Sequence, residues 1–283
     1  KSIQKLDIYD YERPIGIQIF GGELEPMIYS AQVVEAHQPN LLDINYGCPV
    51  KKVVCKDAGA GILKNIPKMM QLTTAVIKST TLPVTVKTRL GWDESTINIV
   101  EVAERLQDIG VQALTIHART RVQMYKGEAD WTWISKVKDN PRLTIPVFGN
   151  GDIDSPQKAK RYKDTFGADG LMIGRAAIGY PWIFREIKAY LDRGEIIAPP
   201  DIHERATACR EHLIHSMEWK GESLGIVEMR RHYAHYFRGY EGIKEFRMRL
   251  VNTMDYRELM TILEEVESHY HDKEDLFAEA HEG

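Results

Sequence analysis

The sequence has few cysteines and no long hydrophobic run. Its 283 residues include three cysteines, Cys48, Cys55 and Cys209, an odd number whose spacing fits neither a disulfide scaffold nor a zinc ribbon. No window holds about 18 uncharged apolar residues, which excludes a transmembrane helix. No apolar run follows Lys1–Lys5, which argues against a signal peptide. These absences predict a cytoplasmic protein.

Positive charge is not in excess either. The chain has 37 basic and 41 acidic residues, a net charge of −4. This balance argues against a polycation that coats nucleic acid, although it leaves room for a local basic patch. With 43% hydrophobic residues, the composition is that of a globular protein with ample material for a core.

Short β-branched apolar runs alternate with helical patterns in the first two thirds of the chain. The runs predict strands at Ile15–Phe20, Leu41–Asn45, Val84–Thr88, Ala113–His117, Ile145–Phe148 and Gly170–Ile173. The intervening patterns predict helices at Glu25–His37, Ile66–Ser79, Ser95–Ile109, Trp131–Asp139 and Ser155–Thr165. Apolar strands joined by helical crossovers indicate a parallel sheet, in either a doubly wound fold or a (β/α) barrel.

Polar or glycine residues follow all six predicted strands, which favours the barrel. In a (β/α)8 TIM barrel the carboxyl ends of all strands converge on one mouth, whereas a doubly wound sheet concentrates its site at one switch point. Six strands do not close an eight-stranded barrel. We therefore expect one or two βα units, about 50 residues, to be missing before Lys1, and an open gap beside Ile15–Phe20.

The pattern changes after Pro199-Pro200. From His203 to Ser268 there is no strand-like run, and four helical segments are punctuated by glycines. The predicted domains are an N-terminally incomplete barrel at 1–198, a small all-α helical bundle at 199–270 and a polar tail at 271–283.

The segment Asn45-Tyr46-Gly47-Cys48-Pro49 is the strongest candidate for chemistry. A cysteine held at a barrel mouth can be a nucleophile, a metal ligand or a proton donor. Metal ligands are lacking at close spacing, and a nucleophile would need an adjacent base. The third role, a general acid that donates its thiol proton, needs neither. For Cys55 and Cys209 we expect only a role as small hydrophobic side chains.

Basic and amide side chains lie at neighbouring strand ends. Lys87 and His117 each precede an arginine by two residues, so each pair should point the same way. Either residue could be structural, but their clustering favours ligand binding. The amide of Gln18 suits the edge of a heterocycle.

Two glycine-containing turns, Gly149-Asn150-Gly151-Asp152 and Gly174-Arg175, follow the last two predicted strands. Such loops are the usual phosphate site of a barrel. Together with the amide, the lysine and the thiol, they suggest a flavin-type redox site.

The predicted helix Gly225–Arg238 has an apolar and a basic face. Ile226, Met229, Tyr233 and Phe237 share one side, whereas Arg231, His235 and Arg238 lie almost opposite and Arg230 lies between. The basic face is either a solvated surface or a contact surface for a phosphate backbone.

The chain resembles bacterial tRNA-dihydrouridine synthases from about Ile15 to Glu265. The motifs that carry the resemblance are Asn45-Tyr46-Gly47-Cys48-Pro49, Ala58-Gly59-Ala60-Gly61, Val84-Thr85-Val86-Lys87, His117-Ala118-Arg119-Thr120, Gly149-Asn150-Gly151-Asp152, Ile173-Gly174-Arg175 and Met229-Arg230-Arg231-His232. Tyr46 and Ala118 stand where the family usually has Met and Gly. The family's first strand, which ends in Pro-Met-Ala-Gly, and its second strand have no counterpart in this chain.

The resemblance implies the FMN-dependent reduction of a uridine in tRNA to 5,6-dihydrouridine, with NADPH re-reducing the flavin and Cys48 protonating C5. It implies FMN binding by Gln18, Lys87, His117, Asn150, Gly151, Asp152, Gly174 and Arg175. It places Asn45 and Arg119 against the target base and Arg230, Arg231 and Arg238 against tRNA. From the sequence we expect no metal, no membrane and no obligate protein partner.

Two other functions remain open from the sequence. A small-molecule pyrimidine reductase, similar to dihydroorotate or dihydropyrimidine dehydrogenases, would share an Asn-x-x-Cys-Pro-like loop, but the basic helical domain argues against it. A non-catalytic RNA-binding barrel is disfavoured because Cys48, Lys87 and His117 are all present.

Overall fold

The computed structural model describes residues 6–271, which fall into two compact units. The first takes in the residues up to Ile153 together with Lys158–Ile173. The second takes in Asp154–Gln157 and the residues from Gly174 onward. In the described range, no helix is both long enough and apolar enough to cross a membrane.

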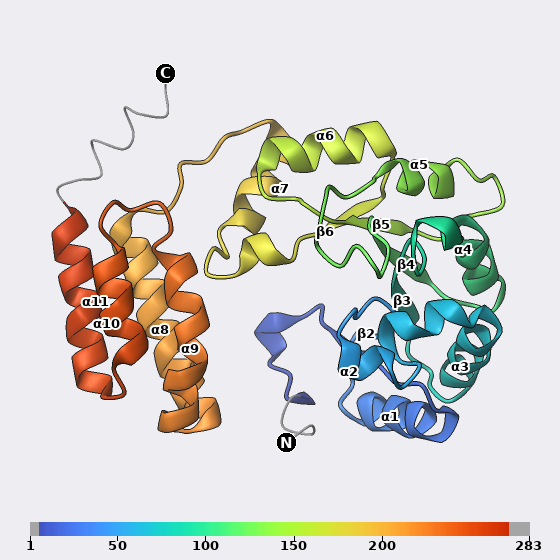
Figure 1. Ribbon diagram of the computed structural model, residues 1–283, viewed down its shortest axis with the longest axis horizontal. Helices are drawn as coiled ribbons and strands as arrows, with labels where there is room; N and C mark the ends of the chain where they lie inside the picture. Colours follow the sequence, from blue (N-terminus) through green and yellow to red (C-terminus); the bar gives the residue numbers. More distant parts are fainter. Residues whose placement is uncertain (1–5, 272–283) are drawn as a thin grey trace. The chain divides into compact units, whose positions relative to one another are not determined.

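The first unit is built on a parallel sheet whose six strands lie in sequence order (Figure 1). The strands are β1 (Gly16–Ile19), β2 (Leu41–Asn45), β3 (Val84–Arg89), β4 (Ala113–His117), β5 (Val147–Asn150) and β6 (Gly170–Met172). Their order never reverses, as it would at the switch point of a doubly wound sheet, which confirms the barrel type. Among residues 6–271, β1 and β6 are unpaired on their outer edges, so the expected gap beside β1 is present.

Helices connect the strands, as predicted. They are α1 (Leu24–Ala36), α2 (Lys51–Val54), α3 (Ile66–Lys78), α4 (Ile99–Asp108), α5 (Thr132–Lys138) and α6 (Pro156–Phe166), with short 3₁₀ turns η2 (Asp10–Glu12), η3 (Gly59–Lys64) and η4 (Glu94–Thr96). In α3, Met69, Leu72 and Val76 are buried at helical spacing. The Asn65 side chain accepts a hydrogen bond from the Lys68 N–H at 3.1 Å, which caps that helix.

The predicted strand Ile145–Phe148 was placed two residues too early, since β5 spans Val147–Asn150. Pro146 has no N–H and contributes only its carbonyl, which accepts from Leu114 N. At the other end, the Asn150 carbonyl accepts from Ala118 N, so the ladder continues through the turn residues. The hydrogen bonds to β4 therefore set the ends of β5, and its own apolar residues do not.

Trp131 packs directly on β5. It is 2% exposed, its indole N–H donates to the Gly151 carbonyl at 3.0 Å, and its ring contacts those of Tyr162 and Phe166. A Cβ on Gly149 would lie 2.1 Å from the indole ring. Glycine is required at this position because the ring occupies the space of a side chain.

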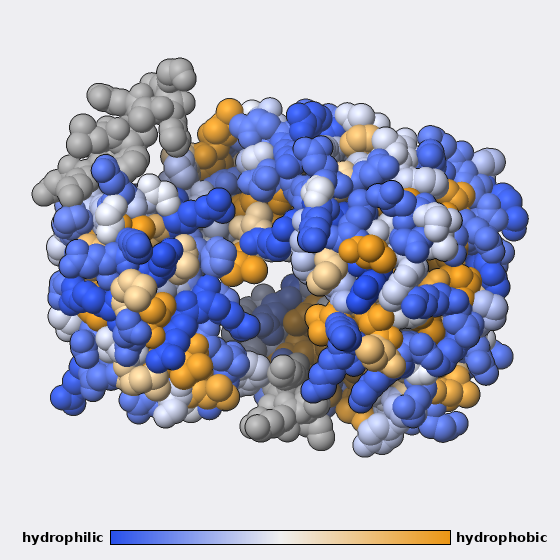
Figure 2. Space-filling model, in the orientation of Figure 1, coloured by the Kyte–Doolittle hydropathy of each residue, from blue (hydrophilic) through white to orange (hydrophobic). Residues whose placement is uncertain are grey.

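The second unit is helical. It contains η5 (Arg175–Ala177), α7 (Ile183–Arg193), α8 (Ile202–Lys220), α9 (Glu222–Tyr236), α10 (Lys244–Asn252) and α11 (Tyr256–His271), and the last four are the predicted helical segments. Their apolar faces share one buried cluster, in which Trp182 also packs. On the face in Figure 2, hydrophilic residues predominate and hydrophobic ones are scattered among them.

The compact units divide the chain after Ile173, earlier than the domain boundary proposed at 198/199. The physical reason is that Tyr180 and Trp182 pack with the buried cluster of the bundle helices. The bundle at 199–270 remains a proposal about domains. The predicted tail at 271–283 lies, apart from His271, outside the described residues.

Replacing Gly149 by Ala should destabilise the chain by about 1–3 kcal/mol, because the added methyl group overpacks the Trp131 ring. The free energy of unfolding in urea measures this effect. Gly47→Ala is the matched control, since a Cβ there would meet no atom closer than 3.7 Å. Equal unfolding free energies for the two variants would contradict the proposed crowding at Gly149.

Candidate active site

The parallel register brings the predicted polar residues of five strands to one edge of the sheet. Asn45 pairs with Lys87, and His117 pairs with both Arg89 and Asn150. Gln18 of β1 lies opposite Asp43 of β2. The sequence prediction of one polar mouth is therefore confirmed for these strand ends.

A chain of hydrogen bonds joins β1, β2 and β3. Asn45 Nδ2 donates to Gln18 Oε1 at 2.7 Å, and Gln18 Nε2 donates to Asp43 Oδ2 at 2.6 Å. Thr85 Oγ1 donates to the other Asp43 oxygen at 2.6 Å. Burial raises the pKa of Asp43, while these hydrogen bonds and the charge of Lys87 oppose that rise.

Asp43 was missed by the sequence reasoning. The sequence could have indicated it, because Asp43 precedes Asn45 by two residues on the same strand and therefore lies on the same face of the sheet. The pairing of Asp43 with Gln18 depends on register and could not be inferred from either strand alone.

The loop that carries Cys48 is held at several consecutive backbone groups. Asn45 Oδ1 accepts from the N–H groups of Gly47 and Cys48 at 2.9 and 3.0 Å. The Cys48 carbonyl accepts from Ala60 N at 3.0 Å. Gly59, at φ +52°, leaves room for this contact, since a Cβ there would lie 2.9 Å from the Cys48 Cβ. The partly exposed thiol is thus presented by a well-anchored loop.

Two arginines tie the same loop to the segment after β4. Arg89 is 2% exposed, and its Nε donates to the Gly47 carbonyl at 2.8 Å. Its Nη1 donates to the Thr120 and Met124 carbonyls, each at 2.9 Å. Arg121 Nη2 reaches the Pro49 carbonyl at 3.4 Å. Arg89 therefore fastens two loops of the mouth together.

The charges at the mouth perturb one another. Burial, followed by the nearby Arg89 charge, lowers the pKa of Lys87 to about 8. Burial, followed by the charges of Arg89, Lys87 and Arg119, lowers the pKa of His117 to about 3. His117 is therefore neutral near pH 7 and can donate from one ring nitrogen and accept at the other. The exposed Tyr125, which the sequence reasoning missed, has its ring 6.2 Å from the His117 ring.

Arg119 and Asp152 form a buried ion pair. Arg119 Nη1 and Nη2 donate to the two Asp152 oxygens at 2.8 and 2.7 Å, and Asp152 also accepts from Ala129 N at 2.8 Å. The remaining Arg119 contacts are to the carbonyls of Lys126 and Gly127. The predicted base contact of Arg119 stays a prediction, and its observed role is to hold the loop after β4.

The residues predicted to bind a phosphate group belong partly to the first unit and partly to the second. Asn150 Nδ2 donates to the Met172 carbonyl at 2.7 Å, which ties β5 to β6. Gly151, at φ +129°, has a conformation that favours glycine. Gly174 follows β6, and Arg175 begins η5 in the second unit. Their role in phosphate binding stays a prediction.

Helix α9 has the two faces that its sequence predicted. Ile226, Met229 and Tyr233 are buried, whereas Arg231 is exposed. Arg238 is also exposed, but it lies just beyond Tyr236, where α9 ends, and not within the helix as predicted. Arg230 is half-buried, and its Nη2 lies 3.1 Å from the Met254 sulfur.

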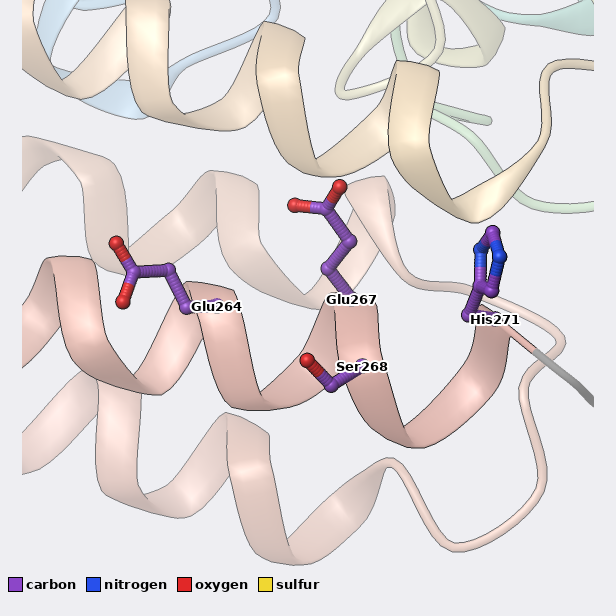
Figure 3. A pocket seen from close by; sticks show the side chains of 4 residues that line it. All are labelled: Glu264, Glu267, Ser268 and His271. Carbon is purple, nitrogen blue, oxygen red and sulfur yellow. The ribbon is translucent and has the colours of Figure 1, made fainter.

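A shallow cavity of about 380 Å³ lies elsewhere, on α11 (Figure 3). Its lining residues are Glu264, Glu267, Ser268 and His271. Glu267 is already ion-paired with Arg210 at 2.7 Å and bonded to His203. Within residues 6–271, no group of three or more His, Cys, Asp or Glu side chains could hold a metal ion.

The chain is similar to several known proteins. The model of the family described as dihydrouridine synthase (Dus) matches residues 1–273. Probable tRNA-dihydrouridine synthase 1 of Synechocystis is 40% identical over 262 residues, covering 93% of this chain and 73% of that protein. The tRNA-dihydrouridine synthase B proteins of Pseudomonas putida and Shewanella oneidensis are 41% and 39% identical, covering 88% and 94% of this chain and 73% and 80% of their own lengths.

His117 should make the chain acid-sensitive. Because its pKa is about 3 in the folded state and about 6.5 when unfolded, the unfolded chain binds the extra proton as pH falls below 6.5. His117→Gln should therefore lose about 2 kcal/mol less unfolding free energy than the wild type between pH 7 and pH 5. Urea denaturation without added flavin measures the difference.

The control for this measurement is His215→Gln, which removes an imidazole that is 75% exposed. A pH dependence of His117→Gln parallel to that of the wild type would show that His117 is not held neutral in the fold.

Proposed function

The chain belongs to the dihydrouridine synthase family, and we propose that it performs the family's reaction with FMN as cofactor, NADPH as reductant and Cys48 as general acid. The reaction is the reduction of a uridine in tRNA to dihydrouridine, and tRNA is the substrate. We place it in the cytoplasm, where tRNA is available. The small-molecule reductase and the non-catalytic barrel are thereby set aside.

The observation that carries the proposal is that two polar side chains at the mouth have no hydrogen-bond partner within the described part of the protein. Among the described residues, neither Lys87 Nζ nor the His117 ring makes a hydrogen bond, although both lie at the polar mouth. Arg89 and Arg119 instead donate to backbone carbonyls and, for Arg119, to Asp152. Because these nitrogens keep hydrogen-bonding capacity that no protein group uses, Lys87 and His117 are suited to a ligand.

These free groups fit the ring of a flavin. The Gln18 amide retains one N–H, Lys87 is a cation, and neutral His117 can donate, which together match a heterocycle edge with carbonyl oxygens and ring nitrogens. We propose that Gln18, Lys87 and His117 hold this edge. Asn150, Gly151, Asp152, Gly174 and Arg175 would hold the phosphate end, as the glycine-containing turns suggest.

The reaction needs one proton donor from the chain. When bound, FMN supplies the hydride that adds to C6 of the uracil ring. Negative charge then develops at C5 and on the C4 oxygen of the uracil. Cys48 delivers its thiol proton to C5, and Asn45, which anchors the Cys48 loop, lies beside the C4 edge. Because the target base is stacked inside tRNA, it must be flipped out to reach the mouth.

Cys48→Ala should reduce dihydrouridine formation about 10²–10⁴-fold, because the positioned general acid is lost. FMN binding, tRNA binding and bleaching of the flavin by NADPH should remain, since the thiol takes no part in them. Nucleoside analysis of tRNA after incubation with FMN and NADPH measures the product.

Cys55→Ala is the control for this experiment, since Cys55 is exposed and lies just after α2 on the same loop connection. Turnover by Cys48→Ala at the wild-type rate would refute the general-acid assignment.

Neutralising Arg231 and Arg238 together should weaken tRNA binding and flatten its salt dependence. The slope of log K against log salt should fall by roughly one unit for each lost phosphate contact. Arg249→Gln is the control, because Arg249 donates to both oxygens of Glu265, whereas Arg231 only approaches Glu228 to 3.6 Å. NADPH oxidation should be unchanged in all variants, and unaltered tRNA affinity would assign the exposed face of α9 to solvent alone.

A further inference from the structure

The hydrogen bonds that lead from the Cys48 loop through Asn45 and Gln18 to Asp43 all run in one direction. From the loop toward Asp43, the N–H of Cys48 donates to Asn45, Asn45 donates to Gln18, and Gln18 donates to Asp43. Thr85 completes the series by donating to Asp43 from the opposite side. We call these four side chains, Asn45, Gln18, Asp43 and Thr85, the amide relay.

Both ends of the amide relay fix its direction. At one end the backbone N–H groups of Gly47 and Cys48 can only donate, so Asn45 must offer them its oxygen. At the other end an ionised Asp43 can only accept, so Gln18 must offer it the amide nitrogen. Burial raises the pKa of Asp43, but both of its oxygens accept hydrogen bonds, from Gln18 and from Thr85, and these bonds and the charge of Lys87 favour the ionised form.

The direction determines what Asn45 still has to offer. Its oxygen already accepts two hydrogen bonds, and one of its two N–H groups donates to Gln18. One N–H donor is left, and no acceptor. If Gln18 were reversed, its amide nitrogen would face the Asn45 nitrogen, and this remaining donor would lose its fixed orientation.

We propose that Asp43 is a specificity-determining positioning residue, which holds Gln18 and thereby Asn45 so that the site offers only an N–H donor to the target base. This inference rests on the proposed placement of Asn45 against the base. Uracil presents a carbonyl oxygen at C4, which accepts from an N–H donor. Cytosine presents an amino group there, which would face Asn45 donor to donor, leaving both groups unpaired.

The test reverses the relay while keeping its shape. Thr85→Val removes one hydrogen bond to Asp43 but leaves the carboxylate, so the direction should persist. The double variant Asp43→Asn, Thr85→Val lacks the carboxylate, and its new amide nitrogen has no hydroxyl group at position 85 to bind. The amide nitrogen of Asn at position 43 should therefore donate to the Gln18 oxygen, which reverses the Gln18 amide. The single variant Thr85→Val and the double variant therefore differ only at position 43, where a carboxylate oxygen is replaced by an amide nitrogen.

The measurement is a binding competition on the FMN-loaded full chain without NADPH, so that no RNA is converted. The two competitors are tRNA transcripts with uridine or cytidine at the position that nucleoside mapping identifies as reduced. The wild type and Thr85→Val should prefer uridine roughly tenfold to a hundredfold. The double variant should prefer it less than about threefold, because its donor is no longer oriented. The ratio is insensitive to a fraction of unfolded protein, since both transcripts report on the folded fraction.

Asn45→Asp provides a second, independent variant. It keeps an oxygen for the N–H groups of Gly47 and Cys48 but has no donor for the base, so the preference for uridine should also disappear.

The outcomes separate the two claims. Equal affinities in the wild type would refute the placement of Asn45 against the base, which belongs to the proposed function. If the wild type prefers uridine and the Asp43→Asn, Thr85→Val variant retains this preference in full, the placement of Asn45 against the base is supported. The proposed role of Asp43 is then overturned. Retention by Asn45→Asp would overturn the donor argument itself.

Discussion

The parallel register of the six strands is the constraint on which the candidate site depends. Parallel strands in sequence order place all carboxyl ends at one edge, and the observed register sets Asn45 beside Lys87 and His117 beside Asn150. A shift of one residue in any strand would turn these side chains to the opposite face. The register is held by apolar residues at alternate positions, such as Leu42 and Ile44 in β2, so the packing of the core aims the polar side chains.

The second constraint is the positive charge gathered at the mouth. Arg119 is neutralised by Asp152, while Arg89 is satisfied by carbonyl dipoles, and Lys87 has only Asp43 to oppose its loss of charge. Burial, together with this excess of cations, explains why the pKa of His117 falls so far and why Lys87 is easier to deprotonate than usual. The same excess favours a ligand that carries or develops negative charge, which suits both a flavin and a uracil that accepts hydride.

The sequence predicted the strands and the polar residues at their ends, because apolar periodicity and strand-end position are local properties. It placed Arg89 at the mouth but did not predict the backbone carbonyls that Arg89 binds, and it missed Asp43, whose partners are side chains of other elements. Arg119 was predicted against the base, but its observed bonds to Asp152 depend on the close approach of two loops. Residue type shows what a group can bind, whereas register and loop packing decide which partner it meets.

Steric crowding around the mouth is the reason that its loops can hold these groups still. Gly59 lies against Cys48, and Gly149 of β5 lies under Trp131, so neither position has room for an extra methyl group. With the Cys48 loop bonded through its carbonyls and N–H groups, little backbone freedom is left for the thiol. A general acid gains from such rigidity, because a proton donor that is already aligned loses less entropy when the reaction occurs. The glycines and the buried arginines therefore serve the same end, which is to fix the direction of one sulfur atom.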